Sequence, residues 1–349
     1  MKIVYYPEPV PNDRYTITVL SLLFDEIVLP ALYLPSKGYT DKELEERIAG
    51  IKKLIAQGNH GYEDHVMLLA MHFAHDYGKL LDIFSGTGKL DEVMPIEPEA
   101  SELAKELEAA YYGPPAPGFT PMISEGVHFG INDDVGSTFR VPSKFTYPAN
   151  AYLYSLKNNL PLISDSSIHP VPSTPHNSNA DTFAAHLAIQ TLGTLALPKI
   201  RPLTQDEILK ARSKLKDDLS NFNNKMYEYV DDLRKIVNES TSATELQREA
   251  KYIADTKIRK DFLDLIKKIE SPGAVLSTEI RNFTLDNAEL IIDLSYKAAL
   301  QDWLSVIKMS ASAAGKFTNG LIKSYQTNKK LRQNSGLNLL LKLPEQYRK

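Results

Sequence analysis

Two short apolar runs near the start of the chain constrain its fold most strongly. "KIVYY" (2–6) and "DEIVLP" (25–30) have the composition of strands, and prolines follow or close both runs. Between them, "YTITVLSLLF" (15–24) has the apolar spacing of a helix. A strand, a helical crossover and a second strand predict a parallel pair, because parallel strands cannot be joined by a tight turn. The chain is therefore predicted to begin as an α/β fold.

The next stretch is predicted to be helical, with helices over 40–57, 62–84 and 98–112. The first of these opens with a capping box, since Glu43 stands three residues after Thr40. "SGTGKLD" (85–91) contains Gly-x-Gly-Lys, but a phosphate-binding loop requires a preceding strand. This segment is therefore interpreted as the end of a helix.

Residues 113–148 are rich in Gly and Pro, which predicts a long loop or short strands. After this loop, "ANAYLYSLKNN" (149–159) predicts a helix, and "LPLISD" (160–165) predicts a buried strand that ends in Asp165. "DTFAAHLAIQTLG" (181–193) predicts the following helix.

From Pro202 onward every pattern is helical, and capping boxes at 204–207 and 242–245 mark two helix starts. The predicted organisation is an α/β domain over 1–199, with a small, mainly parallel sheet, followed by an all-α domain over 200–349.

Charge differs between the two predicted domains. Residues 1–199 carry 14 Lys and Arg against 24 Asp and Glu, and residues 200–349 carry 26 against 20. An acidic first half and a basic C-terminal tail predict attraction to each other, within one chain or between copies. The tail equally predicts contact with a nucleic acid or a protein partner. Its candidate binding residues are Lys323, Lys329, Lys330 and Arg332. The tail also contains the apolar run "GLNLLLKLP" (336–344), which predicts docking on protein, in the form of an intermolecular clasp.

Composition excludes several classes of site. The chain has no Cys, so it contains no disulfide, no thiolate metal site and no cysteine nucleophile. No uncharged apolar run is long enough to span a bilayer, and "MKIVYYPEP" lacks the apolar core of a signal peptide. We therefore expect no membrane contact and a cytoplasmic location.

A polar stripe rich in His and Asp follows the helix predicted over 62–84. His72 and Asp76 stand one helical turn apart and His65 two turns earlier, a spacing that permits binding of one metal ion. The alternative is a solvated face on a mostly buried helix. Neighbouring His75 and Asp76 are about 100° apart on the wheel, so that dipeptide is interpreted as incidental.

The segment "AYLYSLKNNLPLISDSS" (151–167) resembles the last helix–strand unit of PIN-like nucleases. The resemblance implies a metal-dependent nuclease fold in which carboxylates at strand ends hold Mg²⁺ or Mn²⁺. Residue by residue, the first acid maps to Glu8 and the last to Asp165 or the adjacent Ser166. The acid that opens the last helix would fall near Pro148, where this chain has none.

The further candidates are Asp25, Glu26, Asp133 and Asp134, which compensate for the missing acid only if the fold brings them close to the others. The alternative is that Asp165 ends a core strand and caps the turn after it.

"LPKIRPLTQDEI" (197–208), together with this α/β pattern, resembles uncharacterised prokaryotic proteins of antiviral or mobile-element islands. Two functional hypotheses follow. The first is a defence-type protein with a degenerate PIN-like domain that acts by binding protein or nucleic acid. The second is a metal-dependent nuclease or phosphohydrolase that uses the carboxylates near Asp165 or the face of His65, His72 and Asp76.

Overall fold

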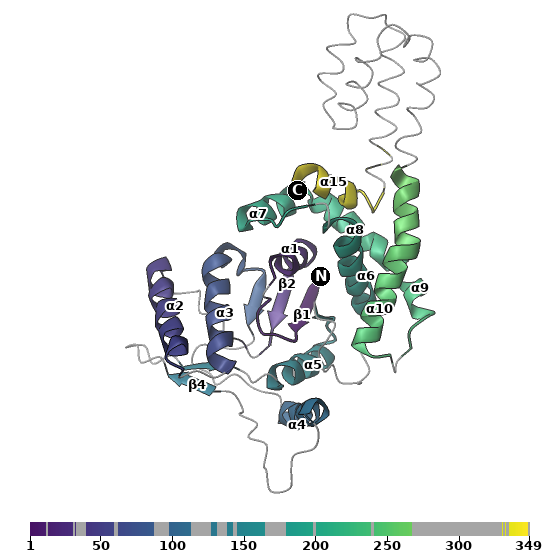
Figure 1. The fold of residues 1–349 in the computed structure, drawn as a ribbon. Coiled ribbons are helices and arrows are strands. Elements are labelled where there is room, and N and C mark those ends of the chain that lie inside the picture. Colours follow the sequence, from purple (N-terminus) through teal and green to yellow (C-terminus); the bar gives the residue numbers. More distant parts are fainter. Residues whose placement is uncertain are drawn as a thin grey trace, which may run out of the picture.

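The structure is a computed structural model of the chain (Figure 1). It describes residues 1–11, 13–30, 32, 40–58, 62–86, 98–112, 127–130, 138–141, 145–164, 179–197, 200–238, 241–266, 330, 332 and 335–347.

A four-stranded parallel sheet lies in the middle of the fold. Its strands are β1 (Lys2–Tyr6), β2 (Glu26–Leu29), β3 (Phe84–Gly86) and β6 (Leu162–Ser164). Their order in the sheet is β3-β2-β1-β6. The predicted parallel pairing of the first two strands is therefore confirmed. Two further strands, β4 (Val127–Gly130) and β5 (Thr138–Val141), form a separate antiparallel hairpin.

The structure describes six α-helices in residues 14–195. They are α1 (Arg14–Leu23), α2 (Asp41–Ala56), α3 (Tyr62–Asp76), α4 (Pro98–Tyr112), α5 (Thr146–Asn158) and α6 (Ala180–Leu195). The predicted capping box of α2 is present, because Thr40 and Glu43 exchange hydrogen bonds. α5 packs against β1 and β6, and α6 packs against α1.

The helix predicted over 62–84 is shorter than expected. α3 ends at Asp76, a short 3₁₀ turn spans Gly78–Leu80, and β3 begins at Phe84. The prediction was wrong because a short apolar run of three or four residues has no period that separates helix from strand. Gly86 of "SGTGKLD" therefore ends a strand rather than a helix, and residues 87–97 lie outside the described part.

The second half is helical wherever the structure describes it. The helices are α7 (Gln205–Lys214), α8 (Lys216–Glu228), α9 (Val230–Arg234), α10 (Ala243–Ile253) and α15 (Leu339–Tyr347). A π-helical segment, Ala254–Ile258, continues α10, and the helix then runs to residue 266. Both predicted capping boxes are present, at Thr204 and Ser242.

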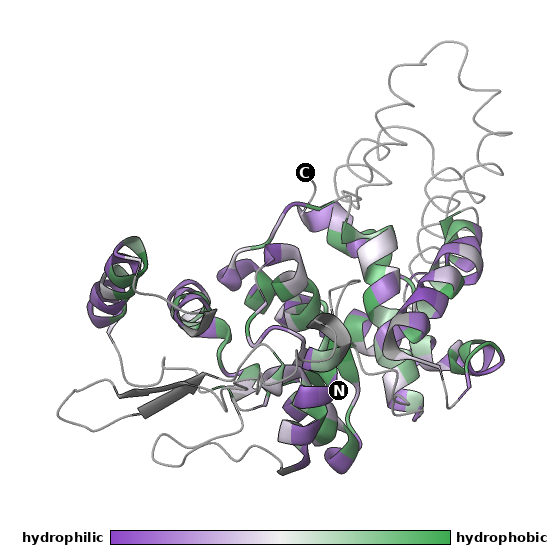
Figure 2. Ribbon diagram, turned by 60° about the horizontal axis from the view of Figure 1, so that its bottom comes forward, coloured by the Kyte–Doolittle hydropathy of each residue, from purple (hydrophilic) through white to green (hydrophobic). Residues whose placement is uncertain are grey.

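The two halves share one buried core. The same cluster contains Ile3 and Ile27 of the sheet and Phe222 and Leu246 of the helical half. α6 connects the two parts of this core, because it packs against α8, α9 and α10 as well as against β6 and α1. Figure 2 shows hydrophobic residues gathered in the middle of the molecule and hydrophilic residues along the outer helices. A domain boundary near residues 197–203 stays a prediction.

Within the described ranges, no helix combines the length and the apolar content that a bilayer crossing requires.

Candidate functional site

The carboxyl ends of β1 and β6 mark the point where the strand order of the sheet reverses. From β1 the chain proceeds through β2 to β3 on one side, and it later returns to place β6 on the other side. Ligands of open parallel α/β sheets bind outside the carboxyl ends of the strands at such a point. Tyr6 and Ser164 are partners in the register there. Glu8 follows Tyr6 by two residues, and Asp165 follows Ser164 directly but lies outside the described residues.

Buried hydroxyl groups occupy this carboxyl edge. The Tyr6 phenol is 3% exposed, and its side chain makes a hydrogen bond with Ser164. Burial raises the pKa of Tyr6, an effect that the Ser164 bond only partly offsets. Both side chains are therefore neutral at ordinary pH.

Tyr147, in the first turn of α5, occupies the same edge. Its hydroxyl donates to the Tyr5 carbonyl over 2.9 Å, which ties the start of α5 to β1. Burial, reinforced by the nearby negative charge of Glu8, raises the pKa of Tyr147 well above its ordinary value. The phenol therefore stays protonated and remains a hydrogen-bond donor.

The start of α5, around Pro148, contains no carboxylate. Its buried polar side chains are Thr146, 1% exposed, and Asn150, 2% exposed. Mg²⁺ and Mn²⁺, which the PIN-like resemblance implies, prefer several carboxylate oxygens. The donors described at this edge are Glu8 and neutral hydroxyl groups, and this set does not fit such an ion.

Asp25 and Glu26 lie at the opposite, amino edge of the sheet. Glu26 pairs with Lys2 over 2.6 Å and accepts a hydrogen bond from Ser85 over 3.3 Å. β1 and β2 are parallel with Lys2 opposite Glu26, whereas Glu8 follows the carboxyl end of β1. The fold therefore does not bring Asp25 and Glu26 to Glu8, and they do not compensate for the missing acid. The other two candidates, Asp133 and Asp134, lie outside the described residues.

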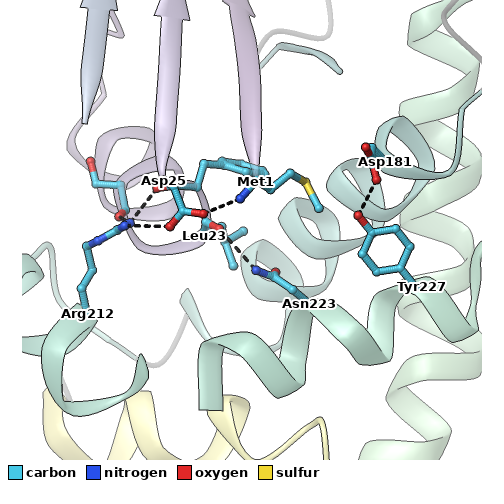
Figure 3. A network of polar contacts seen from close by, with 9 residues as sticks. Met1, Leu23, Asp25, Asp181, Arg212, Asn223 and Tyr227 are labelled. Carbon is cyan, nitrogen blue, oxygen red and sulfur yellow. Dashed lines mark hydrogen bonds and ion pairs between the residues drawn. The ribbon is translucent and has the colours of Figure 1, made fainter. Parts of the chain in front are cut away.

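Asp25 instead belongs to a network that joins the sheet to the helical half (Figure 3). Arg212 of α7 donates to its carboxylate over 3.2 Å and to the carbonyls of Phe24, over 2.6 Å, and Ser21. The Met1 ammonium also contacts Asp25. Burial raises the pKa of Asp25, but these two cations outweigh that effect, so the pKa lies below its usual value.

The His-rich stripe of α3 does not form the predicted metal pair. His65 and Asp76 are exposed and His72 is half-buried. The partner of Asp76 is His75, whose Nδ1 lies 3.1 Å from the carboxylate, while its Nε2 lies 3.8 Å from Glu45.

The side chains of His75 and Asp76 contact each other although the backbone angle between them is about 100°, because both side chains are flexible. The interpretation of this dipeptide as incidental to metal binding stays a prediction. Among the described residues, no group of three or more His, Asp or Glu side chains has an arrangement that would hold a metal ion. Lys79 points toward the helical half, where it pairs with Asp206 over 2.9 Å.

The C-terminal segment docks on its own chain. Leu337, Leu339, Leu340 and Leu343 are each at most 2% exposed. Lys342 and Asn338 bind the two carboxylate oxygens of Asp218 on α8, over 2.6 and 2.7 Å. The apolar run therefore docks on its own chain, and an intermolecular clasp stays a prediction.

Part of the basic tail is also used internally. Arg332 pairs with Glu345 over 2.8 Å, and its side chain is only 16% exposed. Lys330 is exposed, while Lys323 and Lys329 lie outside the described residues. A role of these four residues in binding stays a prediction, but Arg332 would first have to leave Glu345.

Sequence reasoning did not identify Tyr147, Ser164 or Arg212 as members of these networks. Tyr147 had one available signal, because it opens the helix that precedes the last strand. Arg212 had none, since its partners are backbone carbonyls some 190 positions earlier in the chain.

Comparison with protein-family models, with curated proteins and with solved structures finds no match to this chain.

Proposed function

We propose that this chain is a nucleic-acid-binding protein of a prokaryotic defence-type system, with a degenerate PIN-like domain that binds without cleaving. The defence setting and the PIN-like assignment rest on the resemblances of residues 151–167 and 197–208. The four-stranded order β3-β2-β1-β6 is compatible with such a domain.

One observation carries the proposal of binding without cleavage. Where a metal-dependent nuclease gathers carboxylates, this sheet has a buried Tyr6–Ser164 hydrogen bond and a buried Tyr147 hydroxyl. These hydroxyl groups can be buried at little cost because each forms a hydrogen bond. None of them is an anionic ligand of the kind that Mg²⁺ or Mn²⁺ prefers. The carboxyl edge of the sheet therefore serves to pack α5 against β1 rather than to bind a metal ion.

The test uses the full chain with labelled single-stranded DNA, single-stranded RNA and duplex DNA. We expect retention of nucleic acid at low salt that weakens as salt rises, because phosphate contacts release counterions. We expect no cleavage in the presence of Mg²⁺ or Mn²⁺. Gel shift and product analysis on the same samples measure both.

A second candidate function is favoured by the register of β1 and β6, which pairs Tyr6 with Ser164. In the sequence Glu8 follows Tyr6 by two residues and Asp165 follows Ser164 directly. Metal-dependent cleavage by the full chain that is lost in both Glu8→Gln and Asp165→Asn would establish the nuclease and overturn the proposal. Absence of any nucleic-acid retention would overturn it as well.

A further inference from the structure

In the helix that begins as α10 and continues to residue 266, the basic side chains are more exposed to solvent than the acidic ones. All five of its cations are exposed: Arg248, Lys251, Lys257, Arg259 and Lys260. Four of its five acids are only partly exposed: Glu249, Asp255, Asp261 and Asp264. The fifth acid, Glu245, is exposed but is held in the capping box of Ser242. The formal charge of the helix is balanced, yet its outer surface is basic.

The packing of the helix explains this arrangement. Leu246, Ala250, Ile253 and Ile258 are buried, and the helix packs along α6. Hydrophilic and hydrophobic residues both run along α10 in Figure 2, as this one-sided burial requires. Asp261 is drawn inward by the Tyr229 hydroxyl, which donates to it over 2.6 Å.

The π-helical segment aligns the cations on either side of it. In a continuous α-helix, two residues eight positions apart are rotated by about 80° from each other. The extra residue of one π turn reduces this rotation to about 20°. Arg259 is thereby aligned with Lys251, and Lys260 with Tyr252, so cations before and after residues 254–258 share one face.

An exposed aromatic ring lies in the middle of this face. Tyr252 is 58% exposed, the largest value among the exposed large hydrophobic residues of the described part. It stands next to Lys251 and one turn after Arg248. Within the described residues, Lys251 and Lys260 make no ion pair, so their charges are available to a ligand. Lys257 is exposed but pairs with Asp232 of α9, so it is not counted as part of the face.

We propose that Arg248, Lys251, Tyr252, Arg259 and Lys260, the Tyr252 face, form a binding surface for single-stranded nucleic acid. The cations contact successive phosphates, and an unstacked base lies on the Tyr252 ring. A single strand fits better than a duplex, because bases inside a duplex are already stacked on each other. The inference rests on the proposed function of nucleic-acid binding and assigns the surface that performs it.

Two cations of the face already have partners. Arg259 pairs with Asp255 over 2.7 Å and Arg248 with Glu249 over 3.0 Å. In both pairs the cation is exposed and the acid is partly exposed. Pairs of this kind are weak in water, so phosphate competes with them readily. Arg248 keeps a side chain that is 70% exposed.

The experiment measures the affinity of the full chain for single-stranded DNA and RNA by fluorescence anisotropy over a range of salt. Tyr252→Ala is expected to weaken binding about tenfold, because one stacked base is lost. Tyr252→Phe keeps the ring and is expected to bind as the unchanged chain does. The triple variant Arg248→Glu, Lys251→Glu, Lys260→Glu is expected to lose at least a hundredfold and to flatten the salt dependence.

A matched control reverses exposed charge elsewhere on the helical half. Lys210→Glu with Lys214→Glu on α7 is expected to leave the affinity within about threefold, since these residues lie on another helix. Circular dichroism confirms that each variant is folded.

Each outcome decides between the two proposals. Binding by the unchanged chain that Tyr252→Ala and the triple variant leave intact would overturn the Tyr252 face while the proposed function stands. Equal losses in the α7 control would overturn it too, since they would indicate only a general charge effect. Failure of the unchanged chain to bind any nucleic acid would overturn both proposals.

Discussion

The two edges of the parallel sheet are built from opposite kinds of side chain. At the amino edge, Lys2, Asp25, Glu26 and Arg212 are charged and form ion pairs. At the carboxyl edge, the buried groups are neutral hydroxyls, as in the Tyr6–Ser164 hydrogen bond. The candidate acids near strand ends therefore fall into two groups: Asp25 and Glu26 lie at the amino edge, and Glu8 follows the carboxyl end of β1.

The difference shows what each edge does. Charges at the amino edge join the sheet to α7, because Arg212 reaches across to the last carbonyls of α1. The hydroxyls at the carboxyl edge hold α5 against β1 through Tyr147 and the Tyr5 carbonyl.

Removing the Arg212 side chain is expected to have the largest effect. In Arg212→Ala the carbonyls of Ser21 and Phe24 lose a charged donor in a part-buried position. Bonds to a charged group of this kind contribute about 2 to 3 kcal/mol, and we expect the free energy of unfolding to fall by that amount. Urea denaturation of the full chain measures it.

Two further variants separate the contacts of Arg212 from its charge. Arg212→Lys keeps the charge but reaches fewer carbonyls, so about half of the loss is expected. Lys214→Ala removes an exposed cation two residues away and is expected to change stability by less than about 0.5 kcal/mol. If Arg212→Ala were as mild as Lys214→Ala, the amino edge would not join the two halves.

The Tyr147 hydroxyl provides the corresponding test at the carboxyl edge. Tyr147→Phe removes one buried hydrogen bond to the Tyr5 carbonyl and keeps the ring. We expect a loss of about 1 to 1.5 kcal/mol in the free energy of unfolding. Tyr154→Phe, later on the same helix, is the control and is expected to be nearly neutral, because Tyr154 is less buried. Equal effects of the two variants would mean that the carboxyl edge is not held by this bond.

The elements with strong local signals were predicted well. The strand at 2–6, the capped helix after Thr40 and the helix over 98–112 all agree with the structure, since each depends on spacing and capping within a few residues. β3 was missed, because three residues contain too little pattern.

The arrangement of candidate site residues could not be predicted in the same way. The order of strands and helices predicts the strand direction, and this direction places Asp25 and Glu26 at the amino edge. Their partners Arg212 and Ser85 come from distant segments, which no local pattern predicts. The buried pairing of Tyr6 with Ser164 depends on β6 lying beside β1, a long-range choice that local pattern does not encode.

A smaller effect, with a definite pH dependence, is expected from Asp25→Asn. The pKa of Asp25 is lowered in the folded protein, because its two cations outweigh burial. The stability that Asp25 contributes is thus fully present above its unfolded pKa and is lost as pH falls through the folded pKa. The side chain is 76% exposed, so we expect a loss of less than about 1 kcal/mol at neutral pH.

The pH profile distinguishes this ion pair from a general effect of the substitution. The unchanged chain and Asp25→Asn are expected to converge in stability toward the acid end of a denaturation series, since the carboxylate is then protonated in both states. A difference that stayed constant as the pH fell would show that the ion pair with Arg212 contributes nothing.

The smallest effect is expected from Glu26→Gln, and it tests whether the amino edge is a network or a set of separate pairs. Glu26 contacts Lys2 and Ser85 but is 41% exposed, so the exchange is expected to cost about 0.5 kcal/mol or less. The double variant Asp25→Asn, Glu26→Gln gives the coupling. Additive losses mean that each acid acts through its own cation. A combined loss smaller than the sum means that the charges at this edge support one another, because each single variant already loses their shared interaction.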